Sequence, residues 1–420
     1  MRIACFAALA SALAGTFGCS ASHDAGTVAD AGPGEDASGR ADSGPPRSDA
    51  GPEPLCHGRD GCSVAEVVAC LFHVCVRLES GTVGCWGSNQ QGQLVRAGLE
   101  SSPRALRVEG APAFVRFIAG NAYACGVAGG GAIWCWGTDT DGLYDATGGP
   151  STGWLSRVPD AADFARGVAH VCAIRNAGDV TCWGFRGGDG QLGIGSRAIV
   201  REPTLVPGID RVVELALGAL FSCARTSSGR VACWGDNAHG QVGDGTGGTD
   251  GSAFDRLSPV FILDAIRRLS AGGDFACALS ESGEVSCWGD NTRGQVGTDS
   301  HGLAVPAPSR VRFPLGEIII DVAAGFGGMH ACALAASGRV FCWGDNGSGQ
   351  LGYGGGSPQS FDPVSVAGID DATALALGSA FSCAIRRSGE LWCWGHNDEG
   401  QLGDGTLVNR SEPVRVVGLW

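Results

Sequence analysis

The cysteines are the residues whose type and spacing point most clearly to chemistry. Fourteen of the 19 cysteines form seven pairs, and in each pair the second cysteine follows the first by ten positions and opens the phrase Cys-Trp-Gly. The pairs are Cys75 and Cys85, Cys125 and Cys135, Cys172 and Cys182, Cys223 and Cys233, Cys277 and Cys287, Cys332 and Cys342, and Cys383 and Cys393. Zinc ligands usually stand about two to four residues apart, so this spacing matches no zinc pattern. The pairs are predicted to form disulfides, with unoxidised core cysteines as the alternative.

The elements that must position these cysteines are short apolar runs, joined in most units by a turn that ends in glycine. In the first unit the turn is Glu79-Ser80-Gly81, which predicts a β-hairpin with a three-residue loop and a left-handed glycine. Counting outward from Ser80 places Cys75 directly opposite Cys85. Facing residues lie about 4.5 to 5.5 Å apart at Cα, within the range that a disulfide accepts. Seven disulfide-bonded hairpins are therefore expected, each bridge contributing about 2 to 3 kcal/mol.

Five cysteines lie outside this pattern. Cys5 falls in residues 1–18, where Arg2 and a short apolar run predict a signal peptide. Cys19 follows at once in a context that resembles a bacterial lipobox, so lipidation of Cys19 is predicted, with ordinary secretion as the alternative. Cys56 and Cys62 are expected to form an eighth disulfide, which leaves Cys70 free.

Residues 19–55 are rich in Asp, Gly, Ala, Ser and Pro and bury too little apolar surface to offset their ordering entropy. They are predicted to be a disordered tether between the lipid anchor and a domain over residues 56–420. We therefore expect an exported protein, either a lipoprotein of the bacterial outer membrane or cell surface or a secreted protein.

The composition excludes several classes of partner. The formal net charge is −14, and all positive charge comes from arginine because the chain has no lysine. No basic stripe is present to neutralise phosphates, which argues against nucleic acid and against contact with a membrane other than through the lipid anchor. The 71 glycines and few aromatic residues indicate many tight turns and an all-β class.

The Cys-Trp-Gly phrase recurs every 47 to 55 residues and is followed in most units by a phrase such as Gly400-Gln401-Leu402-Gly403. This period is typical of one propeller blade. From residue 63 to 420 the units resemble the repeat of the regulator of chromosome condensation family, the RCC1 repeat. The resemblance implies a seven-bladed β-propeller. The paired cysteines depart from the cytosolic and nuclear members and favour an exported branch.

An extended segment opened by proline or rich in valine precedes six of the units but not the first. A further copy, residues 413–419, ends the chain with no unit behind it. We expect this carboxy-terminal strand to complete the amino-terminal blade and close the ring, because closure hides both sheet edges.

Several repeated residues are interpreted as structural. His73, His170 and His330 occupy a position that other units fill with Tyr or Phe, which indicates a packing role. The repeated glutamines are expected to bond turn backbone through their amides. The stretch from Asp244 to Gly251 alternates Asp, Gly and Thr and could hold calcium, but it lacks the spacing of a recognised calcium loop.

The sequence contains no catalytic triad in a motif context, no phosphate-binding loop and no metal-ligand cluster, so neither an enzyme nor a cofactor is expected. The function predicted is a monomeric binding scaffold for a protein or glycan. Its binding surface is expected on rim loops of unequal length, residues 144–154, 244–257, 298–308 and 353–362. The alternative is a regulator or inhibitor, because the resembled family includes nucleotide-exchange factors for a small GTPase and its fold includes a β-lactamase inhibitor.

Overall fold

Short apolar runs between glycine-rich turns fold into strands, and every regular element in the described residues is a strand. The computed structural model describes residues 55–56, 62–119, 123–129, 132–138, 150–155, 158, 160–168, 170–185, 187–247, 254–298 and 303–419. These residues belong to one unit, residues 51–420. The predicted signal peptide, the lipidation site Cys19 and the tether up to residue 54 lie outside the described residues.

The strands form seven four-stranded antiparallel sheets, numbered here in chain order. Sheet 1 contains β1 (Val64–Ala69), β2 (His73–Leu78), β3 (Val83–Ser88) and β4 (Ser101–Arg107). Sheet 2 contains β5 (Phe114–Ala119), β6 (Tyr123–Ala128), β7 (Ile133–Thr138) and β8 (Pro150–Leu155). Sheet 3 contains β9 (Ala161–Arg166), β10 (His170–Arg175), β11 (Val180–Gly184) and β12 (Thr204–Leu205). Sheets 4 and 5 contain β13 (Val212–Leu217), β14 (Phe221–Thr226), β15 (Val231–Gly235) and β16 (Arg256–Leu263); and β17 (Ile266–Ala271), β18 (Phe275–Ser280), β19 (Val285–Gly289) and β20 (Val305–Arg310). Sheets 6 and 7 contain β21 (Ile319–Ala324), β22 (His330–Ala335), β23 (Val340–Asp345) and β24 (Gln359–Ser365); and β25 (Ala372–Leu377), β26 (Phe381–Arg386), β27 (Leu391–Gly395) and β28 (Arg410–Arg415).

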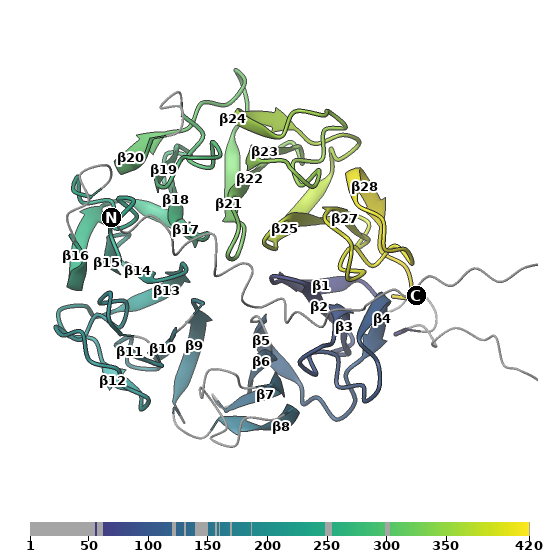
Figure 1. Cartoon of the computed structure of the whole chain (residues 1–420), viewed down its shortest axis with the longest axis horizontal. Coiled ribbons are helices and arrows are strands. Elements are labelled where there is room, and N and C mark those ends of the chain that lie inside the picture. Colours follow the sequence, from purple (N-terminus) through teal and green to yellow (C-terminus); the bar gives the residue numbers. More distant parts are fainter. Residues whose placement is uncertain are drawn as a thin grey trace, which may run out of the picture. The chain divides into compact units, whose positions relative to one another are not determined.

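The seven sheets are arranged in a ring, with the first strand of each sheet nearest the axis (Figure 1). Each of these inner strands contacts the inner strands of both neighbouring sheets, so together they surround the axis of the ring. The fourth strand of each sheet lies at the outer edge. The prediction of an all-β, seven-bladed propeller is confirmed.

The middle hairpin of each sheet has the predicted geometry. In sheet 1, the N–H of Gly81 donates to the carbonyl of Leu78 at 2.9 Å, and Gly81 has a φ of 83° that favours glycine. Cys75 faces Cys85 in the strand register, and the other six pairs face each other in the same way. Each pair is joined as a disulfide with a Cα separation of 4.0 to 4.1 Å. Cys56 and Cys62 form an eighth disulfide, and the thiol of Cys70 is buried and free.

Neighbouring sheets are joined by the tryptophans of the Cys-Trp-Gly phrase, all seven of which are fully buried. In six of the seven sheets the indole N–H donates to the backbone carbonyl of the preceding sheet's repeated glutamine at 2.8 to 3.0 Å. The bond from Trp86 to Gln401 closes the ring, because it joins sheet 1 to sheet 7 across 315 positions. Gly403 permits this approach, since a Cβ there would lie 2.6 Å from the indole nitrogen of Trp86.

The predicted role of residues 413–419 is wrong in one respect. Sheet 1 already contains four strands, and β28 is the fourth strand of sheet 7, where Val414 faces Cys393. The extended segments assigned to the following unit are therefore the outer strands of the preceding one. The chain end still contributes to closure, because the N–H of Leu55 donates to the carbonyl of Gly418 at 3.1 Å.

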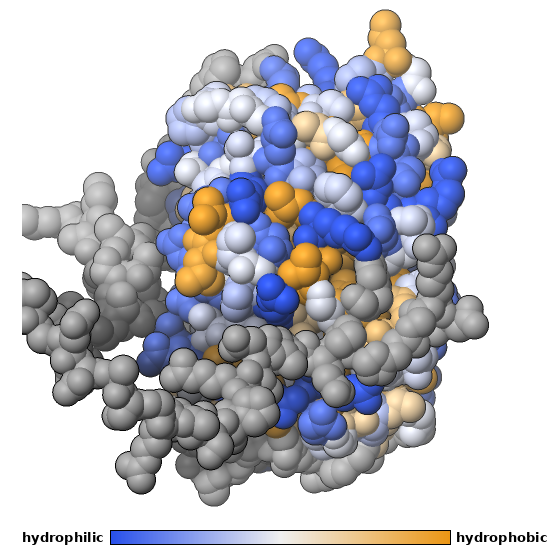
Figure 2. All heavy atoms as spheres, turned by 90° about the vertical axis from the view of Figure 1, so that its right-hand side faces the viewer, coloured by the Kyte–Doolittle hydropathy of each residue, from blue (hydrophilic) through white to orange (hydrophobic). Residues whose placement is uncertain are grey.

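The side of the ring that carries β28 and β4 shows mostly hydrophilic residues with hydrophobic ones between them (Figure 2). In the described part of the chain, no helix is long and apolar enough to cross a membrane.

Candidate functional site

Every inner strand contains an irregularity in its pairing with the second strand. The register against the second strand shifts between the first and third residues of each inner strand, as between Val64 and Glu66. Such β-bulges re-aim side chains. The third residue is charged in six of the seven strands, and we call this set the collar. The collar consists of Glu66, Arg116, Asp163, Glu214, Arg268 and Asp321, and sheet 7 has Ala374 at this position.

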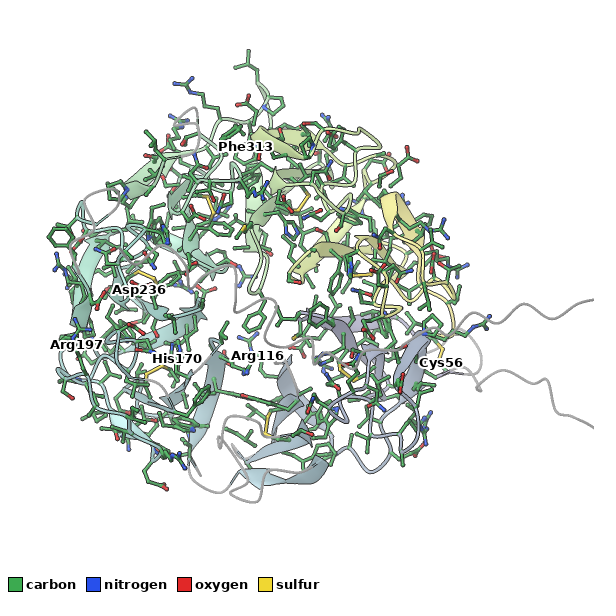
Figure 3. All side chains as sticks on the ribbon, viewed as in Figure 1. Cys56, Arg116, His170, Arg197, Asp236 and Phe313 are labelled. Atoms are coloured by element: carbon green, nitrogen blue, oxygen red, sulfur yellow. A yellow bond between two sulfur atoms is a disulfide. The ribbon has the colours of Figure 1, made fainter. Side chains whose placement is uncertain are left out.

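Ion pairs between neighbouring inner strands link members of the collar. Arg116 of β5 contacts Asp163 of β9 at 3.1 Å, and Figure 3 shows Arg116 reaching toward the centre of the ring. Arg268 contacts Asp321 at 3.0 Å and Glu214 at 3.7 Å. The hydrogen bond that Arg268 donates to Asp321 raises the pKa of Arg268, which therefore stays charged. The axial edge of these sheets thus carries charges of both signs, with Arg116 and Arg268 each paired to acidic neighbours.

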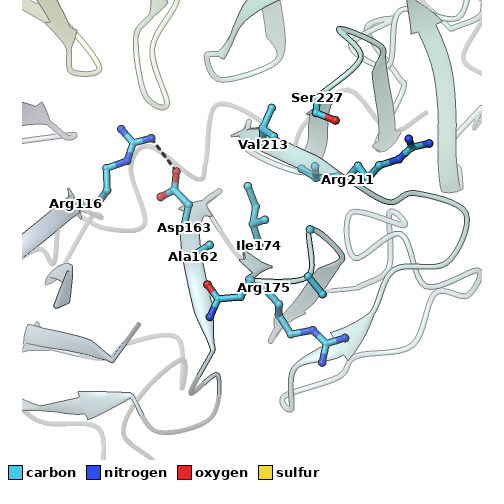
Figure 4. Close-up of a pocket in the computed structure, with 12 residues that line it drawn as sticks. Arg116, Ala162, Asp163, Ile174, Arg175, Arg211, Val213 and Ser227 are labelled. Atoms are coloured by element: carbon cyan, nitrogen blue, oxygen red, sulfur yellow. Dashed lines mark hydrogen bonds and ion pairs between the residues drawn. The ribbon is translucent and has the colours of Figure 1, made fainter. Parts of the chain in front are cut away.

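A groove of about 440 Å³ opens beside the collar, where sheets 2, 3 and 4 meet. Its charged lining residues are Arg116, Asp163, Arg175 and Arg211, and Figure 4 shows how they lie. Three arginines and one aspartate give this lining a formal charge of +2, in a chain whose net charge is −14. Arg175 and Arg211 pair with Asp179 and Asp210, which are not among the lining residues, so the excess of positive charge belongs to the lining residues alone.

The turns of sheets 3 and 4 hold two of these arginines. Arg175 forms an ion pair with Asp179 across the β10–β11 hairpin, and the hydrogen bond that it donates to Asp179 raises the pKa of Arg175. Arg211 has a left-handed backbone with φ of 51°, and its carbonyl accepts from the N–H of Ser227 at 2.8 Å. Arg211 forms an exposed ion pair with Asp210 at 3.8 Å, and its side chain is 76% exposed.

The groove combines these charges with an exposed apolar residue. Val213 lines the groove and is 45% exposed. Guanidinium groups bind carboxylates through two parallel hydrogen bonds. Apolar side chains grouped with such donors are typical of protein-binding surfaces. The arrangement suits an acidic segment that also presents apolar side chains.

The rim loops predicted from the sequence connect the middle hairpin to the outer strand, and the described parts contact the next sheet. The N–H of Gly245 donates to the carbonyl of Pro306 at 2.9 Å, and Gly354 bonds Ser411 in the same way at 3.0 Å. Their first residues therefore hold neighbouring sheets together. Residues 139–149, 248–253 and 299–302, which include parts of three of these loops, lie outside the described residues.

In the described part of the stretch from Asp244 to Gly251, the carboxylate of Asp244 has a structural role. Asp244 accepts from the backbone N–H of Thr246 and from the guanidinium of Arg256. Asp404 repeats these contacts with Thr406 and Arg410. This carboxylate is thus used within its own loop, and no group of three His, Cys, Asp or Glu residues suited to a metal occurs among the described residues.

The repeated glutamines act as predicted. The side-chain oxygen of Gln241 accepts from the backbone N–H of His239 at 2.8 Å, and five other glutamines make the same bond. The buried histidines add contacts that the sequence did not predict. His170 bonds Ser222 of the next sheet at 2.7 Å through Nε2, and His330 bonds Ser382 at 2.9 Å.

Sequence reasoning did not predict the collar, although a signal for it is present. In five of the six charged strands the collar residue stands nine positions before the first cysteine of the pair. Asp321 stands eleven positions before Cys332, because the loop after β21 is longer. A charged residue at the same position of successive, otherwise apolar strands indicates a side chain that lies outside the core.

Comparison with known proteins identifies relatives of this ring. The RCC1-like domain family matches residues 100–419. The E3 ubiquitin-protein ligase HERC2 of Mus musculus is 31% identical over 244 residues, which is 56% of this chain but 5% of the ligase. The mitochondrial RCC1 domain-containing protein RUG3 of Arabidopsis thaliana is 31% identical over 250 residues, 56% of this chain and 54% of that protein. The chain thus spans about half or less of these relatives' length.

Solved structures share the fold. Prp20p of Saccharomyces cerevisiae, whose structure was described with its binding to Gsp1p and histones, has a TM-score of 0.70 at 21% identity and covers 86% of this chain and 90% of its own. Human WBSCR16 has a TM-score of 0.69 at 23% identity, covering 80% of this chain and 94% of its own.

Proposed function

The chain belongs to the RCC1-like domain family, and on this basis we propose that it is a protein-binding module whose groove at sheets 2 to 4 receives an acidic segment of a partner protein. The observation that carries the proposal is the excess of arginine in the groove of a protein that is otherwise strongly acidic. Opposite charges speed association and exclude wrong partners, so an acidic partner segment would be directed to this groove.

Family membership supports the choice of a protein partner. Prp20p binds the proteins Gsp1p and histones, as its published description states. The HERC2 match lies in a small part of that ligase, so ligase activity is not carried over to this chain. Regulation or inhibition of the bound partner, and nucleotide exchange in particular, is the alternative, and it rests on the resemblance alone.

We also propose that the module works outside the cytoplasm, anchored by a lipid on Cys19 after removal of residues 1–18. The paired cysteines support this, since disulfides persist in oxidising compartments. Globomycin should block processing, and Cys19→Ala should release the protein into the medium. Processing that globomycin leaves unchanged would contradict the anchor.

Affinity capture from envelope and culture fluid tests the groove. The baits are the natural protein, an Arg116→Gln/Arg211→Gln variant, and a control Arg104→Gln/Arg310→Gln variant altered on the outer strands β4 and β20. Partners of the natural protein should be recovered by the control and lost by the groove variant. Equal recovery by all three baits would contradict the proposal. If a variant with residues 298–308 shortened loses the partners while the groove variant still recovers them, binding would be assigned to the rim loops.

A further inference from the structure

A cavity of about 280 Å³ lies between the outer strands of sheets 5 and 6. Five of its seven lining residues are polar or charged, so the cavity suits a polar ligand. The lining consists of Gly297 and Thr298 where a predicted rim loop begins, Val305, Ser309 and Arg310 of β20, Arg312 just after it, and Asp362 of β24.

The residue that follows the repeated Gly-Gln-Leu-Gly or Gly-Gln-Val-Gly phrase differs at this place from that of other sheets. Sheets 4 and 7 have Asp244 and Asp404 there, and each carboxylate accepts from an arginine of the outer strand. Sheets 3 and 6 have Ile194 and Tyr353, which pack against core clusters. Thr298 of sheet 5 is smaller than isoleucine or tyrosine and has no charge to hold an arginine. Space therefore remains between the described parts of sheets 5 and 6.

Two charged groups of the lining are not used by the protein itself. Arg310 forms an ion pair with Glu284 at 2.8 Å. By contrast, no hydrogen bond or ion pair within the described residues involves the guanidinium of Arg312 or the carboxylate of Asp362. These two groups belong to different sheets and do not pair with each other. A ligand in the cavity can therefore meet one free positive group and one free negative group.

The backbone on both sides of Arg312 is held in place. Val311 is 2% exposed, and its N–H donates to a carbonyl of β19 at 2.9 Å. The ring of Phe313 lies edge-on to Phe341 and Trp343 of sheet 6, with 6.0 and 5.8 Å between ring centres. Figure 3 shows Phe313 near the outer edge of the ring. Anchored neighbours reduce the conformational freedom of Arg312 before a ligand binds.

An arginine at this place is specific to sheet 5 among the sheets that share the local geometry. In sheets 1, 3, 6 and 7 a valine makes the same backbone bond as Val311, and the residue after it is Glu109, Pro207, Ala367 or Val417. Features that every sheet repeats build the fold, whereas a feature present in one sheet can serve a ligand.

We propose that this cavity binds a hydroxylated carboxylate, such as one uronic acid unit of an acidic glycan. The guanidinium of Arg312 would pair with the carboxylate through two parallel hydrogen bonds. The carboxylate of Asp362, which is an acceptor only, would receive hydrogen bonds from hydroxyl groups of the sugar. This site is separate from the groove proposed for the protein partner.

Titration of the full-length protein with D-glucuronate, followed by saturation-transfer NMR, tests the proposal against two matched probes. D-Glucose lacks the carboxylate, and cyclohexanecarboxylate lacks the hydroxyl groups. Glucuronate should bind at least about tenfold more tightly than either, because its carboxylate and its hydroxyl groups both form charge-assisted hydrogen bonds. Arg312→Gln should abolish the preference over glucose, and Asp362→Ala the preference over cyclohexanecarboxylate.

Two controls separate this site from the rest of the ring. Glu412→Ala changes the position of β28 that corresponds to Asp362, and it should bind glucuronate like the natural protein. The groove variant Arg116→Gln/Arg211→Gln should do the same.

Equal binding of glucuronate and either comparison probe by the natural protein, or no binding of glucuronate, would overturn the proposal. A preference over glucose that Arg312→Gln leaves unchanged would also overturn it. Both Arg312 and Asp362 are exposed, so neither substitution removes a core contact, and each variant tests the site if the other fails to fold.

Discussion

At the scale of single residues, two of the buried histidines link neighbouring sheets through hydrogen bonds. His170 and His330 each meet a serine of the next sheet, and that serine donates to the carbonyl of a repeated glutamine. Sheets 4 and 5 have Phe221 and Phe275 in place of the histidine. The packing interpretation from the sequence holds, but it missed the hydrogen bond, because the serine lies some fifty positions away.

The first sheet lacks this histidine–serine hydrogen bond, which leads to a prediction about stability. Both ring nitrogens of buried His73 have no hydrogen-bond partner among the described residues, and the residue at the serine position of sheet 2 is Ala124. Ala124→Ser should raise the free energy of unfolding by about 1 kcal/mol, since it supplies a partner for a buried polar group. Urea unfolding measures the change, and Ala276→Ser, which faces Phe221 instead, is the control. Equal effects of the two substitutions would refute the pairing.

The same histidines predict a pH dependence. Burial lowers the pKa of His330 to about 3, below the value near 6.5 of an exposed histidine. The folded state keeps the ring neutral while the unfolded chain takes up a proton, so stability is full above pH 6.5 and falls as the pH drops toward 3. A His330→Phe/Ser382→Ala variant, which copies Phe221 and Ala276, should lose less stability on acidification. Between pH 6 and 4, the slope of the free energy of unfolding against pH should differ by about 1.4 kcal/mol per pH unit between the natural protein and the variant. Parallel plots for the two proteins would contradict this.

At the scale of elements, the sequence determines the middle hairpins almost completely. The constant offset between cysteines, the turn glycine and the apolar runs all agree, so strand register and cysteine pairing follow from counting. The outer strands were harder to place, because a long loop separates β28 from its partner β27 and proximity in sequence favours the next unit. The groove was not predicted, because it depends on bulges and on Arg211, whose left-handed backbone has no sequence signature.

The hairpins predict a thiol count. Residues 56–420 contain 17 cysteines, and sixteen of them lie in the eight disulfides. Titration of this segment with a thiol reagent under denaturing, non-reducing conditions should therefore detect one thiol, that of Cys70. A count near seventeen would show that the cysteines are reduced core residues.

At the scale of the whole molecule, the ring is held closed by the same contacts that join its other sheets. Trp86 bonds Gln401 as Trp288 bonds Gln241, although the first pair joins the two ends of the chain. Among the described residues no strand is exchanged between the first and last sheets, so closure depends on contacts such as this hydrogen bond, the bond from the N–H of Gly405 to the carbonyl of Pro103 and the packing of the chain end. Several outer strands contain proline, as at Pro103 and Pro413, which prevents their free edges from pairing with other chains.

This closure can be tested by exchange of amide hydrogens. Trp86→Phe removes the closing hydrogen bond and should cost about 1 kcal/mol, with faster exchange confined to sheets 1 and 7. Trp288→Phe, the matched control, should affect sheets 4 and 5 instead. A uniform increase in exchange around the ring for both variants would contradict closure at the Trp86 contact.

The central claim is that a basic groove on this acidic ring binds acidic protein segments. Its most direct test is the fluorescence anisotropy of a labelled decaglutamate peptide titrated with the natural protein, the Arg116→Gln/Arg211→Gln variant and the Arg104→Gln/Arg310→Gln control at low salt. The natural protein and the control should bind the peptide, and the groove variant should bind at least about tenfold more weakly, since each lost charged hydrogen bond costs about 1.5 kcal/mol or more. Equal affinity of all three proteins for the peptide, or no binding by the natural protein, would contradict the claim.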